Sequence, residues 1–189
     1  RYLARKITLA SHLFAKFPYS TFSLNHIFVQ REAKELADKS HYHDAIEILN
    51  HAIDHNELAD FFVRRAVCHK NLMMFTEAYY DYSLAIQIEP EDGAHFAARA
   101  LVLLKLHKMQ LALEDFSRAC KYSPCANHFF QRGLLYTDMG SYKNATDDLK
   151  AAISVSLNGA GNEFELRCRY RCALAYFYDG QLQMAIDEA

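Results

Sequence analysis

Small residues return at a nearly fixed interval along most of this chain. One position is alanine in every copy: Ala45, Ala78, Ala112, Ala145 and Ala185. Successive copies are 33 or 34 residues apart, and the last follows after 40 residues. A chain with such a period is built from repeated supersecondary units, because each unit places the same residue type in the same contact. The fold is therefore limited to an array of similar units.

Three further columns keep the same register. The first is small: Ala33, Ala66, Ala100, Gly133 and Ala173. The next is large and apolar: Leu49, Tyr82, Phe116 and Leu149. The last is alanine again: Ala52, Ala85, Ala119 and Ala152. The spacing predicts two helices per unit, in which a small residue on the first lets the second lie close. No unit buries its apolar face alone, so neighbours must stack.

Aromatic residues and prolines add a resemblance to a known family. A phenylalanine lies four residues before the small column in three repeats: Phe62, Phe96 and Phe129. An aromatic residue opens the second helix at Tyr42, Phe75 and Tyr142. A proline follows the second helix at Pro90 and Pro124. With the columns, this pattern resembles the tetratricopeptide-repeat family across residues 26–189, with Phe where that family has Trp. The resemblance implies an all-α solenoid, a right-handed superhelix of antiparallel helix pairs.

The period divides the chain into a short N-terminal segment and about five repeats. The repeats are 26–58, 59–92, 93–125, 126–159 and an incomplete 166–189. Residues 1–25 are expected to form a helix and a linker, with Pro18 ending the helix and Ser23 or Asn25 capping the next one. The stretch SLNGAGNEFE, before repeat 5, is expected to be a surface loop or a short break between extended helices. The chain begins at Arg1 and stops within a helical pattern, so we expect it to be a piece of a longer protein.

A second pattern joins the two helices of three repeats. An arginine in the first helix is followed sixteen residues later by an aspartate: Arg65 and Asp81, Arg99 and Asp115, Arg132 and Asp148. In an antiparallel helix pair, positions beside the small contact face each other. We interpret these pairs as a ladder of structural ion pairs, which leaves the arginines little capacity to bind a ligand.

Motifs for catalysis or for metal binding are weak. The chain has no glycine-rich phosphate loop, no GxSxG and no HExxH. His51 and His55 have the spacing of metal ligands but lack a third, and Cys168 and Cys172 are read as buried apolar residues. We therefore predict no enzymatic activity, no cofactor and no metal. Five cysteines, an odd number, favour a reducing compartment.

The resemblance also implies where a partner binds, because in this family the first helix of each pair lines an inner, concave wall. Transferred to this chain, the wall includes Gln30, Arg31, Lys34, Arg64, Val67, Lys70, Asn71, Leu101, Lys105, Phe130, Gln131, Arg167, Tyr170 and Arg171. The wall is basic at both ends and apolar in the middle, which suits a peptide or helix with apolar anchors and acidic flanks. The alternative is that the chain's own N-terminal segment, or a neighbouring repeat, covers part of this surface. The positions of the Lys and Asn clamp that holds chaperone tails in some members are incompletely matched, which disfavours that role.

The function that follows is a scaffold or adaptor that binds a protein partner. The alternatives are a structural subunit of a large cytoskeletal or ciliary assembly, and a regulatory domain of a larger enzyme. A net charge of −2 gives no electrostatic drive toward nucleic acid, and no apolar run is long enough to span a bilayer. A cytoplasmic location is expected, with the cilium or cytoskeleton as the alternative.

Overall fold

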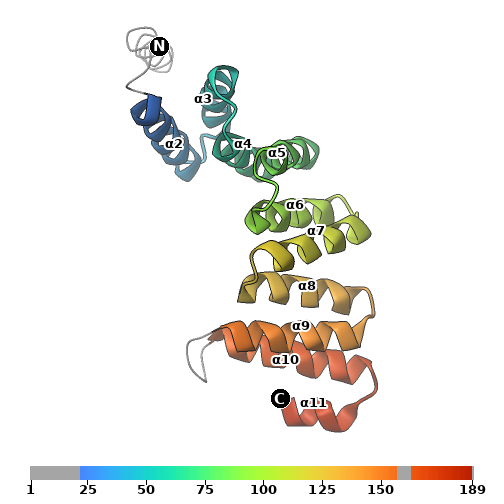
Figure 1. Cartoon of the computed structure of the whole chain (residues 1–189). Helices are drawn as coiled ribbons and strands as arrows, with labels where there is room; N and C mark the ends of the chain where they lie inside the picture. The colour runs from blue at the N-terminus through green and yellow to red at the C-terminus, as the bar shows by residue number, and fades with distance from the viewer. Residues whose placement is uncertain (1–21, 157–162, 189) are drawn as a thin grey trace. The chain divides into compact units, whose positions relative to one another are not determined.

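The computed structural model describes residues 22–156 and 163–188. Within these ranges the chain forms ten α-helices and no strand (Figure 1). They are α2 (Phe22–Asp38), α3 (Tyr42–His55), α4 (Ala59–Asn71), α5 (Phe75–Ile88), α6 (Gly93–Lys105), α7 (Met109–Tyr122), α8 (Ala126–Asp138), α9 (Tyr142–Val155), α10 (Glu163–Tyr178) and α11 (Leu182–Glu188). The fold is therefore all-α, as predicted.

The helices form pairs joined by short turns, and each turn contains one residue with positive φ. These residues are Ser40, Met73, His107, Gly140 and Gly180, with φ between 58° and 79°. Glycine adopts this left-handed conformation without strain, whereas the other three residues do so at some cost. The same turn geometry recurs in every pair, so the repeat extends to the backbone.

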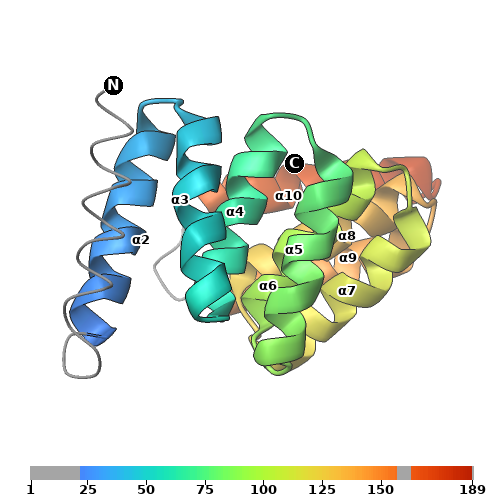
Figure 2. The same ribbon diagram turned by 90° about the horizontal axis from the view of Figure 1, so that it is seen from above.

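The chain divides after Pro90 into two compact units. In the first unit, α3 packs between α2 and α4, and α5 packs on α4 (Figure 2). One apolar core, from Val29, Ala33, Leu49, Ala52 and Phe61, joins the first three helices. A second, from Ala59, Phe62 and Ala85, joins α4 and α5. The first unit thus consists of two helix pairs packed through shared apolar contacts.

The second unit stacks α6 to α11 in chain order. Figure 1 shows α8, α9 and α10 as successive layers of this stack. The largest core here comes from α8, α9 and α10: Phe130, Leu149, Ala152, Cys168, Cys172 and Tyr176. Repeats 4 and 5 therefore share one apolar core, although the sequence between them is longer.

The four sequence columns form the contacts between helices. The large column is buried, with Leu49, Phe116 and Leu149 at 0% exposure and Tyr82 at 2%. The alanines of the second column are fully buried in the first four pairs, whereas Ala185 in the last pair is only partly buried. A Cβ added to Gly133 would lie 3.0 Å from Leu149 Cγ, so a larger residue would push the two helices apart. The packing role predicted for the columns is confirmed in repeats 1 to 4.

Two boundaries differ from the expectations. Helix α2 begins at Phe22, so Ser23 and Asn25 lie inside it and neither is its N-cap. No proline or glycine follows Pro18 until Pro90, so none interrupts α2. The low helix propensity of Ser23 and Asn25 costs only about 0.5 kcal/mol each. Helix α10 begins at Glu163, three residues before the predicted start of repeat 5. The remaining expectations for residues 1–21 and 157–162 lie outside the described residues.

Candidate functional site

The arginine and aspartate pairs lie in contact across their helix pairs. Arg99 Nε donates to Asp115 Oδ2 at 2.7 Å, and Nη2 donates to Oδ1 at 2.8 Å. Arg132 holds Asp148 in the same two-bond geometry, with both distances 2.7 Å. This hydrogen bond raises the pKa of Arg132, and burial partly opposes the rise. Each arginine is paired with a carboxylate of its own repeat, which favours a structural role for the arginine.

The third pair belongs to a larger network. Arg65 Nη2 donates to Asp81 Oδ1 at 2.6 Å, and Nη1 donates to Asn50 Oδ1 at 2.7 Å, which ties α4 to α3. His69 Nδ1 lies 2.9 Å from Asp81 Oδ2. Asp81 is only 3% exposed, so its contacts with Arg65 and His69 compensate for its burial. The sequence did not indicate Asn50 or His69, because neither residue recurs at the matching position of other repeats.

Each of these arginines also covers an aromatic ring. The guanidinium carbon of Arg65 lies 5.5 Å from the centroid of the Phe62 ring, and Arg99 and Arg132 lie 5.8 Å from Phe96 and Phe129. These phenylalanines occupy the position where the family has Trp. The cation over the ring adds a favourable contact to the ion pair. Each ring belongs to the same helix as its arginine, so it supports the guanidinium, and the ion pair joins the two helices of a pair.

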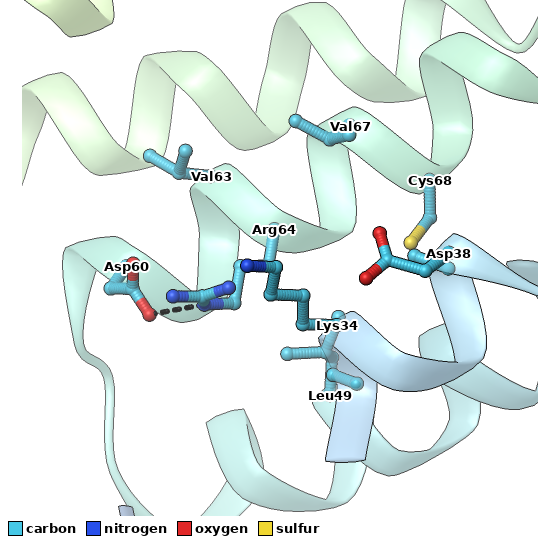
Figure 3. A pocket seen from close by; sticks show the side chains of 10 residues that line it. Lys34, Asp38, Leu49, Asp60, Val63, Arg64, Val67 and Cys68 are labelled. Carbon is cyan, nitrogen blue, oxygen red and sulfur yellow. Dashed lines mark hydrogen bonds and ion pairs between the residues drawn. The ribbon is translucent and has the colours of Figure 1, made fainter. Parts of the chain in front are cut away.

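A pocket of about 320 Å³ lies between α2 and α4 in the first unit (Figure 3). Its wall contains Ala33, Lys34, Ala37, Asp38, Leu49, Asp60, Val63, Arg64, Val67 and Cys68. Lys34, Arg64 and Val67 were among the residues predicted for the partner-binding wall. The structure therefore brings residues from two repeats together around one concave, largely apolar space, which is the usual form of a binding site.

A hydrogen-bond network closes one end of the pocket. Asp60 Oδ2 accepts from Gln30 Nε2 at 2.5 Å and from Arg64 Nε at 2.6 Å. The bond to Gln30 crosses from α4 to α2, so it sets the distance between the two helices at this level. Gln30 was predicted to contact a partner, and here its side-chain amide is bonded within the chain. Figure 3 shows the bond between Arg64 and Asp60 at this end.

Other residues predicted for the wall are accessible to solvent. In the first unit, Arg31 is exposed and lies 3.8 Å from Glu35, Lys70 is partly buried, and Asn71 donates to the carbonyl oxygen of Val67 at 2.9 Å. In the second unit, Leu101, Lys105, Arg167, Tyr170 and Arg171 are exposed and Gln131 is partly buried. These side chains remain available to a partner in their own unit.

Phe130 is a correction to the predicted wall, because it is only 3% exposed. The ring of Phe164 lies 5.4 Å from its ring, and the guanidinium carbon of Arg167 lies 5.2 Å from its centroid. Both residues belong to α10, which starts earlier than expected and so covers this face of α8. Phe130 is a core residue, and a partner cannot reach it in this structure.

Cys168 and Cys172 lie in the core of the second unit, both at 0% exposure. Burial raises the pKa of Cys168 to about 11 and that of Cys172 to about 12. Both are therefore neutral thiols at physiological pH, in keeping with their reading as small apolar residues. Among the helices of the described ranges, none has the length and hydropathy that crossing a membrane requires.

Residues 129–158 match the family model for the tetratricopeptide repeat. Two human relatives were found: tetratricopeptide repeat protein 6, 28% identical over 109 residues, and tetratricopeptide repeat protein 13, 27% identical over 110 residues. These alignments cover 54% and 58% of this chain, but only 21% and 12% of the relatives. The chain thus spans about a fifth or less of the curated relatives that it matches.

Solved structures share the fold at low sequence identity. A crystal structure of MamA protein superposes with a TM-score of 0.74 at 15% identity and covers 86% of both chains. The structure of YrrB, described as a TPR protein with an unusual peptide-binding site, gives a TM-score of 0.70 at 19% identity, covering 85% of this chain and 80% of YrrB. At such identities the likeness shows the solenoid fold alone. Together with this shared fold, the family match and the human relatives support a tetratricopeptide-repeat protein.

Proposed function

We propose that this protein is a non-enzymatic scaffold that binds an extended segment of a partner protein along the first helices of its repeats. Tetratricopeptide-repeat proteins generally serve as scaffolds for protein interactions. The pocket between α2 and α4 carries the proposal, because it combines an apolar floor with charged side chains from two repeats. A pocket of about 320 Å³ has room for a large apolar side chain of a bound peptide. The peptide-binding site named for YrrB supports this by likeness of fold.

The second unit offers a further surface on α10. Leu166, Tyr170 and Phe177 are 60%, 61% and 57% exposed, and Arg167 and Arg171 lie beside them on the same helix. Exposed apolar residues gathered on one helix mark an interaction surface more often than isolated ones do. We propose that this stripe receives apolar groups of the partner, with the arginines contacting its acidic residues.

One observation favours a structural subunit as a second candidate function. On the outer face of α5, Tyr80, Leu84 and Ile88 are 62%, 38% and 42% exposed at successive helical turns. Where α5 has Tyr80, the second helices of repeats 1, 3 and 4 have an acid: Glu47, Glu114 and Asp147. An apolar stripe that includes one position otherwise occupied by an acid suits a contact within an assembly.

Selection from a random peptide display library tests the scaffold proposal. We expect the chain to enrich peptides whose binding is lost in Val67→Trp, which fills the pocket, or in Arg171→Glu on α10. The matched control Lys143→Glu, an exposed site on α9, should retain binding, and circular dichroism should show that all variants keep their helices. If Leu84→Glu alone abolishes binding, the second candidate is favoured. Enrichment of no peptide would contradict the scaffold proposal.

A further inference from the structure

The bond between Gln30 and Asp60 sets the register of the two helices that form the pocket. Helices α2 and α4 each lie antiparallel to α3, so α2 and α4 run in the same direction. Residues at equal distances along the chain from Gln30 and from Asp60 therefore lie opposite each other across the pocket. One helical turn beyond Gln30 and Asp60 are Lys34 and Arg64, and one turn further are Asp38 and Cys68. In Figure 3, Asp60 lies at one end of the pocket, and Asp38 lies beside Cys68 at the other.

The charged side chains along this pocket differ in whether they have partners within the protein. Asp60 already accepts two hydrogen bonds at Oδ2, from Gln30 and Arg64, so its charge is compensated within the protein. Lys34 and Asp38 are exposed and have no hydrogen-bond or ion-pair partner among the residues that the structure describes. The pocket therefore has a cationic level, with Lys34 and the outer nitrogens of Arg64, and an anionic level at Asp38.

The floor between the two charged levels is aliphatic, from Ala33, Ala37, Leu49, Val63 and Val67. Four residues of helix rise about 6 Å, which is close to the length of two residues in an extended peptide, about 6.6 Å. In an extended peptide the side chains on either side of an anchor point away from the floor, toward the solvent-exposed side of the pocket where Lys34 and Asp38 lie. A peptide with an aliphatic residue on this floor can therefore present its two neighbouring side chains to the two charged levels.

We infer that this pocket reads the order of charges around an aliphatic anchor in the partner. An acidic side chain on one side of the anchor meets Lys34 and Arg64, and a basic side chain on the other side meets Asp38. This inference rests on the proposed function and names the sequence class that the pocket selects. Residues 1–31 of this chain contain no Asp or Glu, so its own N-terminal segment cannot supply the acidic residue.

Two peptides of equal composition test this order. One contains Glu-Leu-Lys and the other Lys-Leu-Glu, in the same glycine and serine frame, and both are capped at each end to remove the terminal charges. Fluorescence anisotropy with the protein of residues 1–189 should show that one order binds at least about fivefold tighter, the effect of about 1 kcal/mol. The swapped variant Lys34→Asp/Asp38→Lys, which has the same net charge, should prefer the opposite order.

The controls separate this inference from the proposed function. Val67→Trp should bind neither peptide, while Lys143→Glu should keep the preference of the wild-type protein. Equal binding of both orders, or an unchanged preference in the swapped variant, overturns the inference and leaves the scaffold function standing. If the wild-type protein binds neither peptide up to millimolar concentration, the inference is overturned. The peptide display selection then tests the scaffold function separately.

Discussion

Arg99 and Asp115 are joined across the pair α6 and α7, with Nε of the arginine 2.7 Å from Oδ2 of the carboxylate. Asp115 is only 4% exposed, so its charge depends on this partner rather than on water. A buried carboxylate that loses its cation keeps its desolvation cost. The contact is therefore a condition for the fold of this repeat.

Replacing Arg99 with methionine should lower the free energy of unfolding by about 3 kcal/mol, because Asp115 is left buried without a cation. The double variant Arg99→Met/Asp115→Leu should recover most of this loss, since it removes the stranded charge as well. Urea unfolding followed by circular dichroism measures both. Lys105→Met, at an exposed lysine of the same helix, is the control and should change stability by less than about 0.5 kcal/mol. Equal losses in Arg99→Met and in the control would argue against the structural role.

Phe130 and Tyr170 stand 40 residues apart at matching positions of repeats 4 and 5. Phe130 is 3% exposed and Tyr170 is 61% exposed. We expect Phe130→Ala to cost about 3–4 kcal/mol of stability, as for other buried phenylalanines. Tyr170→Ala should cost less than about 0.5 kcal/mol and weaken partner binding instead. Thermal unfolding and peptide binding distinguish the two roles, and a stable Phe130→Ala variant would contradict the burial of this ring.

Ala78 is fully buried between α4 and α5. Ala78→Leu should overpack this contact and cost about 1–3 kcal/mol, because neither helix can move without losing its other contacts. Thr76→Leu, on the exposed side of the same helix, adds a similar volume and should be nearly neutral. The melting temperature of each variant is the measurement. A melting temperature of Ala78→Leu equal to that of the wild-type protein would contradict the packing role.

Burial raises the pKa of Cys168 to about 11 and of Cys172 to about 12, from an ordinary value of 9.0. The folded state therefore favours the neutral thiols, and this contribution to stability is complete below pH 9. Above pH 9 the thiols ionise in the unfolded chain before they ionise in the folded one, so stability falls as the pH rises from 9 toward about 12. Tyr82, whose pKa burial raises to about 12, adds to the same decline.

Urea midpoints measured at pH 7.5, 9 and 10.5 should reveal this decline. The variant Cys168→Ala/Cys172→Ala is less stable at neutral pH because it leaves a cavity. Its midpoint should nevertheless fall less steeply above pH 9. A slope equal to that of the wild-type protein would show that these thiols do not titrate as proposed.

The repeat period predicted the fold because a packing contact needs a small residue wherever two helices meet. Ala66, Ala100 and Gly133 could therefore be read directly as contacts between helices. The sequence left open whether the stretch before repeat 5 is a loop or a short break between extended helices, since periodicity locates the centre of a helix better than its ends. Phe130 is buried in the core that α8, α9 and α10 share, so its burial depends on how α10 packs on the other two helices. The bond between Gln30 and Asp60 was also missed, because it depends on the register of helices from different repeats.

The arginine and aspartate contacts span only 16 residues of sequence. Closing such a short segment costs little chain entropy, and contacts of low sequence separation favour fast folding. We expect each helix pair to form locally, with its ion pair among the first tertiary contacts. Neighbouring pairs then add to the growing stack one after another, so folding can start at more than one place along the chain.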